Sequence, residues 1–236
     1  MEKRMKIGIL CAGDREFAPF VTRIQEQKII KTAMLTIHEG TMAGVNVAAL
    51  YSGVCKVNAA IAAMTLIDRG CDAIINAGTA GGMDPRLELF DTVVCTQSAY
   101  HDVDAGILTD FHPWMDSVWF DADETLLRLA KQAALGHATR TFFGRMVTGE
   151  QFVAGHARDA INEGFAPLCA DMETAAIAHV CYARHIPFIA VRTITDTASH
   201  DGAGAFIQNC AKAAQISADF TCAMLEAMHT TRESAE

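Results

Sequence analysis

The chain has 236 residues, of which 51% are hydrophobic, and this is enough to build a sizeable core in a single domain. Its formal net charge is −9, and no cluster of Lys or Arg follows the first few residues, so nucleic acid is not an expected partner. Polar residues interrupt every apolar run and no secretory signal precedes Asp14, which argues against a membrane span and against export. The 8 cysteines are dispersed without a C-x-x-C pair, as is typical of reduced thiols in a cytoplasmic protein.

Short apolar runs rich in β-branched residues alternate with longer segments of helical period. The predicted strands are residues 6–11, 34–38, 45–51, 73–77, 92–96, 142–147 and 188–193. The predicted helices are residues 57–68, 123–135, 172–185 and 203 to about 228. This alternation predicts an α/β fold. The apolar runs at residues 34–38 and 45–51 flank Gly40 and Gly44 like the two strands of an antiparallel excursion. The sheet is therefore expected to be mixed.

Two segments fall outside this pattern. Residues 103–121, which include Pro113 and Trp114, form the longest irregular stretch, and a long ordered loop is often functional. Residues 230–236 are polar and are expected to fray. The predicted organisation is therefore one domain over residues 1–229, followed by a polar tail over residues 230–236.

Two acidic residues stand beside the predicted ends of strands. Glu16 follows the first strand through a turn at Gly13, and Glu173 lies in the first turn of a helix whose N-cap is predicted to be Asp171. Open α/β sheets bind ligands at the C-terminal ends of their strands, but the helix dipole alone also explains an acidic residue in a first helical turn. Neither G-x-G-x-x-G nor a P-loop follows the first strand, so these nucleotide-binding motifs are excluded there.

Two further segments leave alternatives open. The sequence Asn-Ala-Gly-Thr-Ala-Gly-Gly at residues 76–82 either lets a ligand approach the backbone closely or forms a tight turn with positive φ. Arg192 and Asp196 either face one pocket or form a structural ion pair. Metal binding is a third interpretation for Asp196 with His200, and it is also an interpretation for residues 101–104. Neither spacing is a recognised metal signature, so neither a metal nor another cofactor is expected.

Five motifs, taken together and in order, resemble the nucleoside phosphorylase and nucleosidase superfamily. They lie at residues 8–16, 76–82, 148–152 (Thr-Gly-Glu-Gln-Phe), 171–175 (Asp-Met-Glu-Thr-Ala) and 191–196 (Val-Arg-Thr-Ile-Thr-Asp). Residues 176–181, Ala-Ile-Ala-His-Val-Cys, are similar in particular to the bacterial methylthioadenosine/S-adenosylhomocysteine nucleosidases. The resemblance implies a single-domain, three-layer α/β/α fold of the nucleoside phosphorylase type. It also implies a hydrolase of methionine salvage that releases adenine from a 5'-substituted adenosine.

The same resemblance implies individual roles. Glu16, assisted by Arg192, deprotonates the attacking water, while Asp196 gives a proton to N7 of the leaving adenine. For Asp196 to hold this proton, its pKa must be raised by burial or by nearby carboxylates. Residues that the resemblance places around the substrate are Thr79 and Gly81 at the ribosyl centre, Met172 and Glu173 at the ribose hydroxyls, Phe152 and Val153 at adenine, and Val54 and Phe206 along the ribose and 5' substituent.

A phosphate-dependent purine nucleoside phosphorylase on the same fold is the main alternative. Hexameric phosphorylases carry an arginine in their G-D-P-x-R loop, where this chain has Phe17, and a second one where it has Asn76. Arg15 remains a candidate phosphate contact. In the nucleosidases glycine is usual at the position of Cys55, and a neighbouring subunit closes the 5' pocket. The resemblance therefore implies a homodimer, with residues 107–114 as its lid or interface.

Overall fold

The computed structural model of the chain describes residues 5–112, 114–153, 156–198 and 203–233. The strands are β1 (Lys6–Cys11), β2 (Gln25–Thr32), β3 (Leu35–Met42), β4 (Val45–Tyr51), β5 (Ala73–Gly82), β6 (Thr92–Tyr100), β7 (Phe120–Asp121), β8 (Thr141–Thr148), β9 (Cys169–Asp171) and β10 (Phe188–Asp196). The helices are α1 (Asp14–Val21), α2 (Lys56–Asp68), α3 (Ala105–Asp110), α4 (Glu124–Gly136), α5 (His156–Phe165), α6 (Thr174–Ala183) and α7 (Ala203–Glu233). Within these ranges, no helix has both the length and the apolar character needed to cross a membrane.

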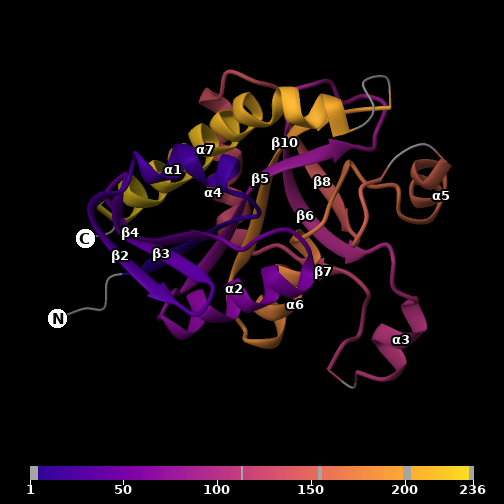
Figure 1. The fold of residues 1–236 in the computed structure, drawn as a ribbon, viewed down its shortest axis with the longest axis horizontal. Coiled ribbons are helices and arrows are strands. Elements are labelled where there is room, and N and C mark those ends of the chain that lie inside the picture. Colours follow the sequence, from indigo (N-terminus) through magenta and orange to yellow (C-terminus); the bar gives the residue numbers. More distant parts are fainter. Residues whose placement is uncertain (1–4, 113, 154–155, 199–202, 234–236) are drawn as a thin grey trace.

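A mixed sheet runs through the middle of the molecule (Figure 1), as the sequence predicted. Its strands follow the order β10-β6-β8-β9-β5-β1-β4-β3-β2, with β7 beside β6. The central strand β5 runs parallel to β1 and β10, whereas β2, β3 and β4 form an antiparallel excursion at one edge. Because β5 also pairs with β9, the strands β5, β10, β6, β8 and β9 form a closed circuit of pairings.

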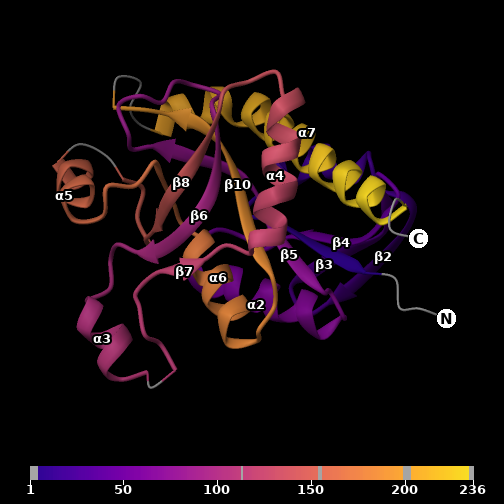
Figure 2. The ribbon, with the colours of Figure 1, turned by 180° about the vertical axis from the view of Figure 1, so that it is seen from behind.

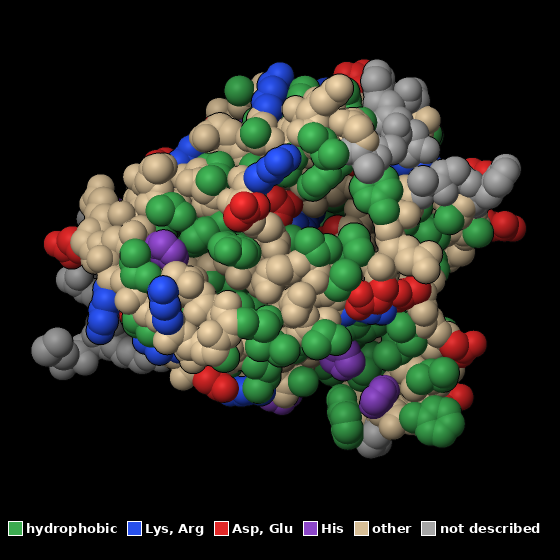
Figure 3. All heavy atoms as spheres, viewed as in Figure 1, with side chains coloured by type: hydrophobic (Ala, Val, Ile, Leu, Met, Phe, Trp, Pro, Cys, Tyr) green, Lys and Arg blue, Asp and Glu red, His purple; other side chains and the backbone are tan. Residues whose placement is uncertain are grey.

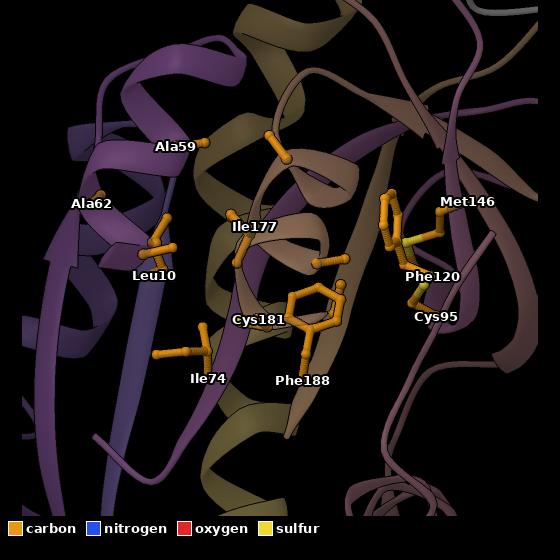
Figure 4. Close-up of a cluster of buried hydrophobic side chains, with 14 of the residues drawn as sticks. Leu10, Ala59, Ala62, Ile74, Cys95, Phe120, Met146, Ile177, Cys181 and Phe188 are labelled. Atoms are coloured by element: carbon orange, nitrogen blue, oxygen red, sulfur yellow. The ribbon is translucent and has the colours of Figure 1, made fainter. Parts of the chain in front are cut away.

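Helices cover both faces of the sheet, so the expected three-layer α/β/α arrangement is confirmed (Figures 1 and 2). Helices α2 and α6 pack together on one face, over a core cluster that includes Leu10 and Ile74 (Figure 4). Helices α1, α4 and α7 pack on the opposite face, over a cluster that includes Ile75 and Phe220. Ile74 and Ile75 belong to different clusters because successive side chains of a strand point to opposite faces.

All the predicted strands and helices form, with changes at their ends. Strand β5 extends beyond its predicted end and continues through Gly82. The described glycines with positive φ are Gly44, Gly53 and Gly70, and none of these lies within residues 76–82. The tight-turn interpretation of residues 76–82 is therefore wrong. The last helix continues through Glu233, so residues 230–233 of the predicted tail extend α7.

Several short elements were not predicted. Strand β2 is polar and largely exposed at the edge of the sheet, so its sequence lacks the alternation of a half-buried strand. The irregular stretch at residues 103–121 contains α3 and β7. Helix α5 begins just after the described loop that carries Phe152 and Val153. This helix contributes an arginine to the site described next.

Candidate active site

A cavity of about 380 Å³ opens where β1, β5 and β10 end. Ala12, Ala80 and Asp196 line it from the ends of these three strands, which are parallel and therefore finish at the same edge of the sheet. Figure 3 shows a hollow near the middle of this face, with acidic and basic side chains in and beside it. The predicted site residues that line the cavity are Glu16, Val54, Thr79, Gly81, Phe152, Val153, Met172, Glu173, Asp196 and Phe206. Arg192, the remaining predicted site residue, lies buried behind this surface.

Glu16 is held in one orientation at the start of α1. Its Oε2 accepts hydrogen bonds from the backbone N–H groups of Ala12 and Gly13, at 2.9 and 3.1 Å. Its Oε1 accepts from the backbone N–H and the hydroxyl of Thr79, at 2.7 and 2.8 Å. The carboxylate thus caps α1, as the helix-dipole interpretation expects, and also faces the cavity with only 6% of the residue exposed. The two interpretations of Glu16 are compatible.

Arg192 is completely buried beside three carboxylates. Its Nη2 lies 2.6 Å from Asp171 Oδ2 and 3.6 Å from Glu173 Oε2. Nη2 also donates to Asn76 Oδ1 at 2.7 Å. The other terminal nitrogen, Nη1, lies 4.0 Å from Glu16 Oε1 and makes no hydrogen bond with the described residues. Burial alone would lower the pKa of Arg192, but the surrounding carboxylates raise it, so the guanidinium stays charged.

Glu173 has the environment of a carboxyl group that is difficult to ionise. Burial, and then repulsion from Asp171, raise its pKa to about 8, although Arg192 acts in the opposite direction. Its Oε1 accepts a hydrogen bond from the backbone N–H of Cys55 at 2.9 Å, which ties α6 to the start of α2. Glu173 itself is the N-cap residue of α6, although Asp171 had been predicted there. Asp171 Oδ1 nevertheless accepts from the backbone N–H of Thr174, at 3.1 Å.

Two glycines of β5 make room for these charged groups. A Cβ atom on Gly78 would lie 2.6 Å from both Glu16 Oε1 and Arg192 Nη1. A Cβ atom on Gly81 would lie 2.9 Å from Asp196 Oδ2. Real Cβ atoms do not come this close to carboxylate oxygens, so the glycines allow acidic side chains to reach the strand. Glycine at these two positions therefore makes room for the side chains of the site as well as for a ligand.

Asp196 is almost completely buried, with 1% exposed, at the end of β10. Its Oδ1 accepts a hydrogen bond from the hydroxyl of Thr195 at 2.9 Å. Its Oδ2 lies 3.8 Å from Nη2 of Arg158, an arginine of α5 that also lines the cavity. The remaining wall is more apolar: Phe152 and Val54 are 45% and 50% exposed at the opening, and Val153 and Phe206 are partly buried.

Comparison with known proteins places the chain in a family. The phosphorylase superfamily matches residues 6–226 of the chain. A 5'-methylthioadenosine/S-adenosylhomocysteine nucleosidase from Actinobacillus succinogenes is 35% identical over 227 residues, which cover 94% of this chain and 98% of the relative. The chain belongs to this nucleosidase family.

Solved structures of nucleosidases share the fold along almost the whole chain. An S-adenosylhomocysteine nucleosidase from Streptococcus pyogenes, in complex with 5-methylthiotubericidin, has a TM-score of 0.88 and 30% identity, and the match covers 95% of this chain and 97% of that one. The futalosine hydrolase of Helicobacter pylori also has a TM-score of 0.88, with 26% identity, and covers 96% of this chain and 99% of its own. The same fold thus occurs in nucleosidases with different named substrates.

The sequence left open whether Arg192 and Asp196 form a structural ion pair, and in this member of the nucleosidase family they do not. The ionic partners of Arg192 are Asp171, Glu16 and Glu173. A register shift in β10 lies between Ile194 and Asp196. The two charged residues of β10 therefore lie in separate electrostatic clusters.

Three residues to which the sequence assigned no site role contribute to the candidate site. Asp171 and Asn76 hold Arg192, and the motifs that contain them were the available signal. Arg158 had no such signal, since an arginine in a short polar helix is ordinarily exposed. Among the described residues, no group of three or more His, Cys, Asp or Glu side chains is arranged to hold a metal ion. His200, part of the metal interpretation, lies outside the described residues.

Proposed function

We propose that the chain hydrolyses the N-glycosidic bond of 5'-substituted adenosines such as methylthioadenosine and S-adenosylhomocysteine. The products are adenine and a 5'-substituted ribose. Membership of the nucleosidase family supports this proposal. The observation that carries it is that two buried carboxyl groups line the same cavity, that of Glu16 from the start of α1 and that of Asp196 from the end of β10. Cleavage of a glycosidic bond by water needs a base on one side and an acid on the other.

On the ribosyl side, Glu16 acts as the base. A water molecule between its carboxylate and the Nη1 atom of Arg192 is held by an acceptor and by a donor that otherwise has no hydrogen-bond partner among the described residues. The water oxygen forms a bond to C1' of the ribose, and its proton passes to Glu16. Thr79 donates to the same carboxylate and keeps it aimed at the water.

On the base side, the bond between C1' and N9 breaks and its electron pair moves into the purine. Asp196 gives its proton to N7, so adenine leaves as a neutral molecule rather than as an anion. The backbone of Val153 reads the amino-pyrimidine edge of adenine, and the ring of Phe152 stacks on it. Support for these contacts comes from the position of both residues in the cavity wall.

The ribose occupies the part of the cavity between the two carboxyl groups. Glu173 and the backbone of Met172 bind its hydroxyl groups, and Gly81 leaves room beside the ribosyl centre. Val54 and Phe206 line the ribose and the 5' substituent, and Val54 is half exposed there. An open end of this kind accommodates substituents of different sizes.

Hydrolysis is favoured over phosphorolysis because the positions of the two phosphate-binding arginines are occupied by other buried groups. Phe17 packs in the core and contacts His38 edge-on. Asn76 is completely buried and donates to the carbonyl oxygen of Leu10 at 2.9 Å. Of the two arginines in the described cavity wall, Arg158 pairs with Asp196, which leaves Arg15 at the mouth. One exposed cation is a poor site for a phosphate dianion.

The decisive experiment is an assay of adenine release from methylthioadenosine, S-adenosylhomocysteine, 5'-deoxyadenosine and aminodeoxyfutalosine, with and without phosphate. We expect release without phosphate, with the free 5'-substituted ribose as product and no loss of activity after treatment with a chelator. Strict phosphate dependence, with a ribose 1-phosphate as product, would show that the chain is a phosphorylase. Loss of activity on chelation, restored by one metal, would contradict a metal-free mechanism.

We also propose that the enzyme is a cytoplasmic homodimer of methionine salvage. The described cysteines are all free thiols, as expected in a reducing compartment. Three residues of α2, Val57, Ile61 and Met64, have exposed fractions of 70%, 44% and 36% and recur at helical spacing along one face. The segment around α3 adds Phe111 and Trp114, which are 77% and 58% exposed.

We refer to these apolar side chains together as the α2–α3 face. The hydroxyl of Tyr182 on α6, itself 43% exposed, donates to the carbonyl oxygen of Trp114 at 2.5 Å, which joins α6 to the segment around α3. In Figure 3, green side chains gather on the part of the molecule where α3 lies in Figure 1. The face continues to the cavity mouth through Val54, which precedes α2. A second copy bound here covers the apolar surface and closes the 5' end of both cavities.

A further inference from the structure

Arg158 is a buried arginine at the base side of the cavity. Only 5% of the residue is exposed, although it belongs to the short helix α5, whose neighbouring positions are largely exposed. Its Nη1 donates to the backbone carbonyl oxygen of Gly82, and its Nη2 lies 3.8 Å from Asp196 Oδ2. A guanidinium so far removed from water requires a counter-ion. The Asp196 carboxyl group is in the position to supply it.

The two oxygens of Asp196 have different surroundings. Oδ1 accepts from Thr195, whereas Oδ2 faces Arg158 and lies against the backbone at Gly81, where a side chain would leave no room. Arg158 is itself anchored to the backbone at Gly82, the last residue of β5. The guanidinium of Arg158 therefore lies between the end of β5, to which it is hydrogen-bonded, and the Asp196 carboxyl group, with which it forms an ion pair.

We propose that Arg158 is the positioning residue of the leaving-group acid: it orients the Asp196 carboxyl group and sets the pH above which Asp196 no longer holds the proton for N7. This inference rests on the proposed function, in which Asp196 protonates the purine. The sequence led us to expect that burial or nearby carboxylates raise the pKa of Asp196. The side chain is buried as expected, but the structure puts a cation beside it, and a cation favours the ionised carboxylate.

The electrostatic consequence has a definite sign. A positive charge within about 4–6 Å of a carboxyl group lowers its pKa by roughly 1–3 units. With Arg158 present, Asp196 is a stronger acid, which transfers its proton more readily but holds it over a narrower range of pH. Arg158 therefore limits activity on the alkaline side. The other charged side chains that line the same cavity are Asp14, Arg15 and Glu16 from α1, Asp171 from β9, and Glu173 at the start of α6.

The test compares Arg158→Gln with Arg158→Lys in the full-length protein. Glutamine retains a donor for the carbonyl oxygen of Gly82 but removes the charge, whereas lysine retains the charge. The measurement is kcat/KM for adenine release from methylthioadenosine between pH 5 and pH 10, together with a thermal melt of each variant. We expect the alkaline limb of Arg158→Gln to move up by roughly 1–3 pH units and that of Arg158→Lys to stay within about half a unit of the wild type.

Arg140→Gln is the matched control, because Arg140 forms an ion pair with Asp91 at 2.5 Å outside the cavity wall. Its pH profile should be that of the wild type. A purely structural role for Arg158 would lower the melting temperature and reduce activity equally at every pH, and an unmoved alkaline limb in a folded Arg158→Gln protein would overturn the proposal.

The failure of this inference can be distinguished from failure of the proposed function. If the wild type releases no adenine from any substrate, the proposed function is wrong and the pH profile cannot be used. The carboxyl ¹³C resonance of Asp196, assigned by its loss in Asp196→Asn, then reports the ionisation directly. Its titration should move to higher pH in Arg158→Gln, and an unchanged midpoint would overturn the coupling between Arg158 and Asp196.

Discussion

The buried Asp196 carboxyl group lies between a hydroxyl donor and a guanidinium, and it faces the cavity from the end of β10. Replacement by asparagine keeps the shape of the side chain but removes the transferable proton. We expect Asp196→Asn to reduce the rate of adenine release by roughly 100-fold or more, while adenine still binds. Steady-state kinetics and calorimetric titration with adenine measure the two effects separately.

A matched control uses a second buried aspartate that pairs with an arginine. Asp91 is 5% exposed and binds Arg140 outside the cavity wall. Asp91→Asn should lower the melting temperature and leave kcat within a factor of about two, because it removes the charge of a buried carboxylate that pairs with the half-exposed Arg140, away from the reaction. Near-wild-type turnover in a folded Asp196→Asn protein would remove Asp196 from the mechanism.

Glu173 gives a prediction about stability and pH. Its ordinary pKa is 4.5, and burial with the neighbouring Asp171 raises it to about 8 in the folded protein. Between these two values the folded state holds a proton that the unfolded state has lost, so the free energy of unfolding falls as the pH rises from about 5 to 8. The slope is up to about 1.4 kcal/mol per pH unit, the value of 2.303RT for one proton. Glu173→Gln cannot ionise and should flatten this slope.

The measurement is urea-induced unfolding at several values of pH within that window. Glu124→Gln serves as the control, because Glu124 is exposed in the first turn of α4. Its slope should equal that of the wild type. An identical slope in Glu173→Gln would mean that Glu173 is already ionised in the folded protein at pH 5.

The residues at strand ends were predictable because their motifs follow apolar runs, and parallel strands end at the same edge of a sheet. The burial of Arg158 was not, because it depends on how α5 folds over the cavity, which no local pattern in the sequence encodes. The ionic partners of Arg192 were also not predictable, because Asp171 and Glu173 reach it from other elements of the fold.

At the scale of single elements, the start of α2 contains local strain. Cys55 has φ 84° and ψ 160°, a conformation that is almost restricted to glycine, and its N–H donates to Glu173. We expect Cys55→Gly to relieve about 1–3 kcal/mol of strain, partly offset by the greater freedom of glycine in the unfolded chain. A net gain of about 1 kcal/mol would raise the melting temperature by roughly 2–4 °C.

Cys55→Ala is the appropriate comparison, since it removes the thiol but retains the Cβ atom that causes the strain. It should not raise the melting temperature. Equal stabilisation by Cys55→Ala and Cys55→Gly would attribute the effect to loss of the thiol, and the backbone explanation would then be wrong.

The long elements of the fold were predictable because their apolar residues recur with a clear period. The glycines of β5 were less informative, since the same Gly-rich sequence suits a turn or an extended strand, and only the packing of Glu16, Arg192 and Asp196 against them decides between the two. Strand β2 lacks a buried face, so the pattern that identifies other strands is absent from it.

At the scale of the whole molecule, the α2–α3 face predicts the oligomeric state. Ile61→Asp introduces a charge near the middle of its helical stripe, where a second copy would have to desolvate it. We expect light scattering to report two chains for the wild type and one for this variant at the same concentration. Activity should also fall, because the 5' end of the cavity is then left open.

Leu135→Asp provides the control, since Leu135 is 89% exposed on α4, which packs on the opposite face of the sheet. This variant should remain dimeric and active. A fully active wild-type monomer at assay concentration would contradict the proposed dimer.

The closed circuit of strand pairings affects which parts of the enzyme open by local unfolding. Strand β5 is hydrogen-bonded to β1, β10 and β9, so its amide groups cannot be released by fraying of a sheet edge. Local openings of a protein usually detach edge strands and surface helices first, and the central strands exchange their amide protons only in rare global openings. In deuterium exchange, the amides of residues 74–81 and 189–194 should therefore be the slowest in the chain, and β2 should exchange orders of magnitude faster. Thr79 and Arg192 therefore keep their relative positions even while the periphery of the molecule opens and closes.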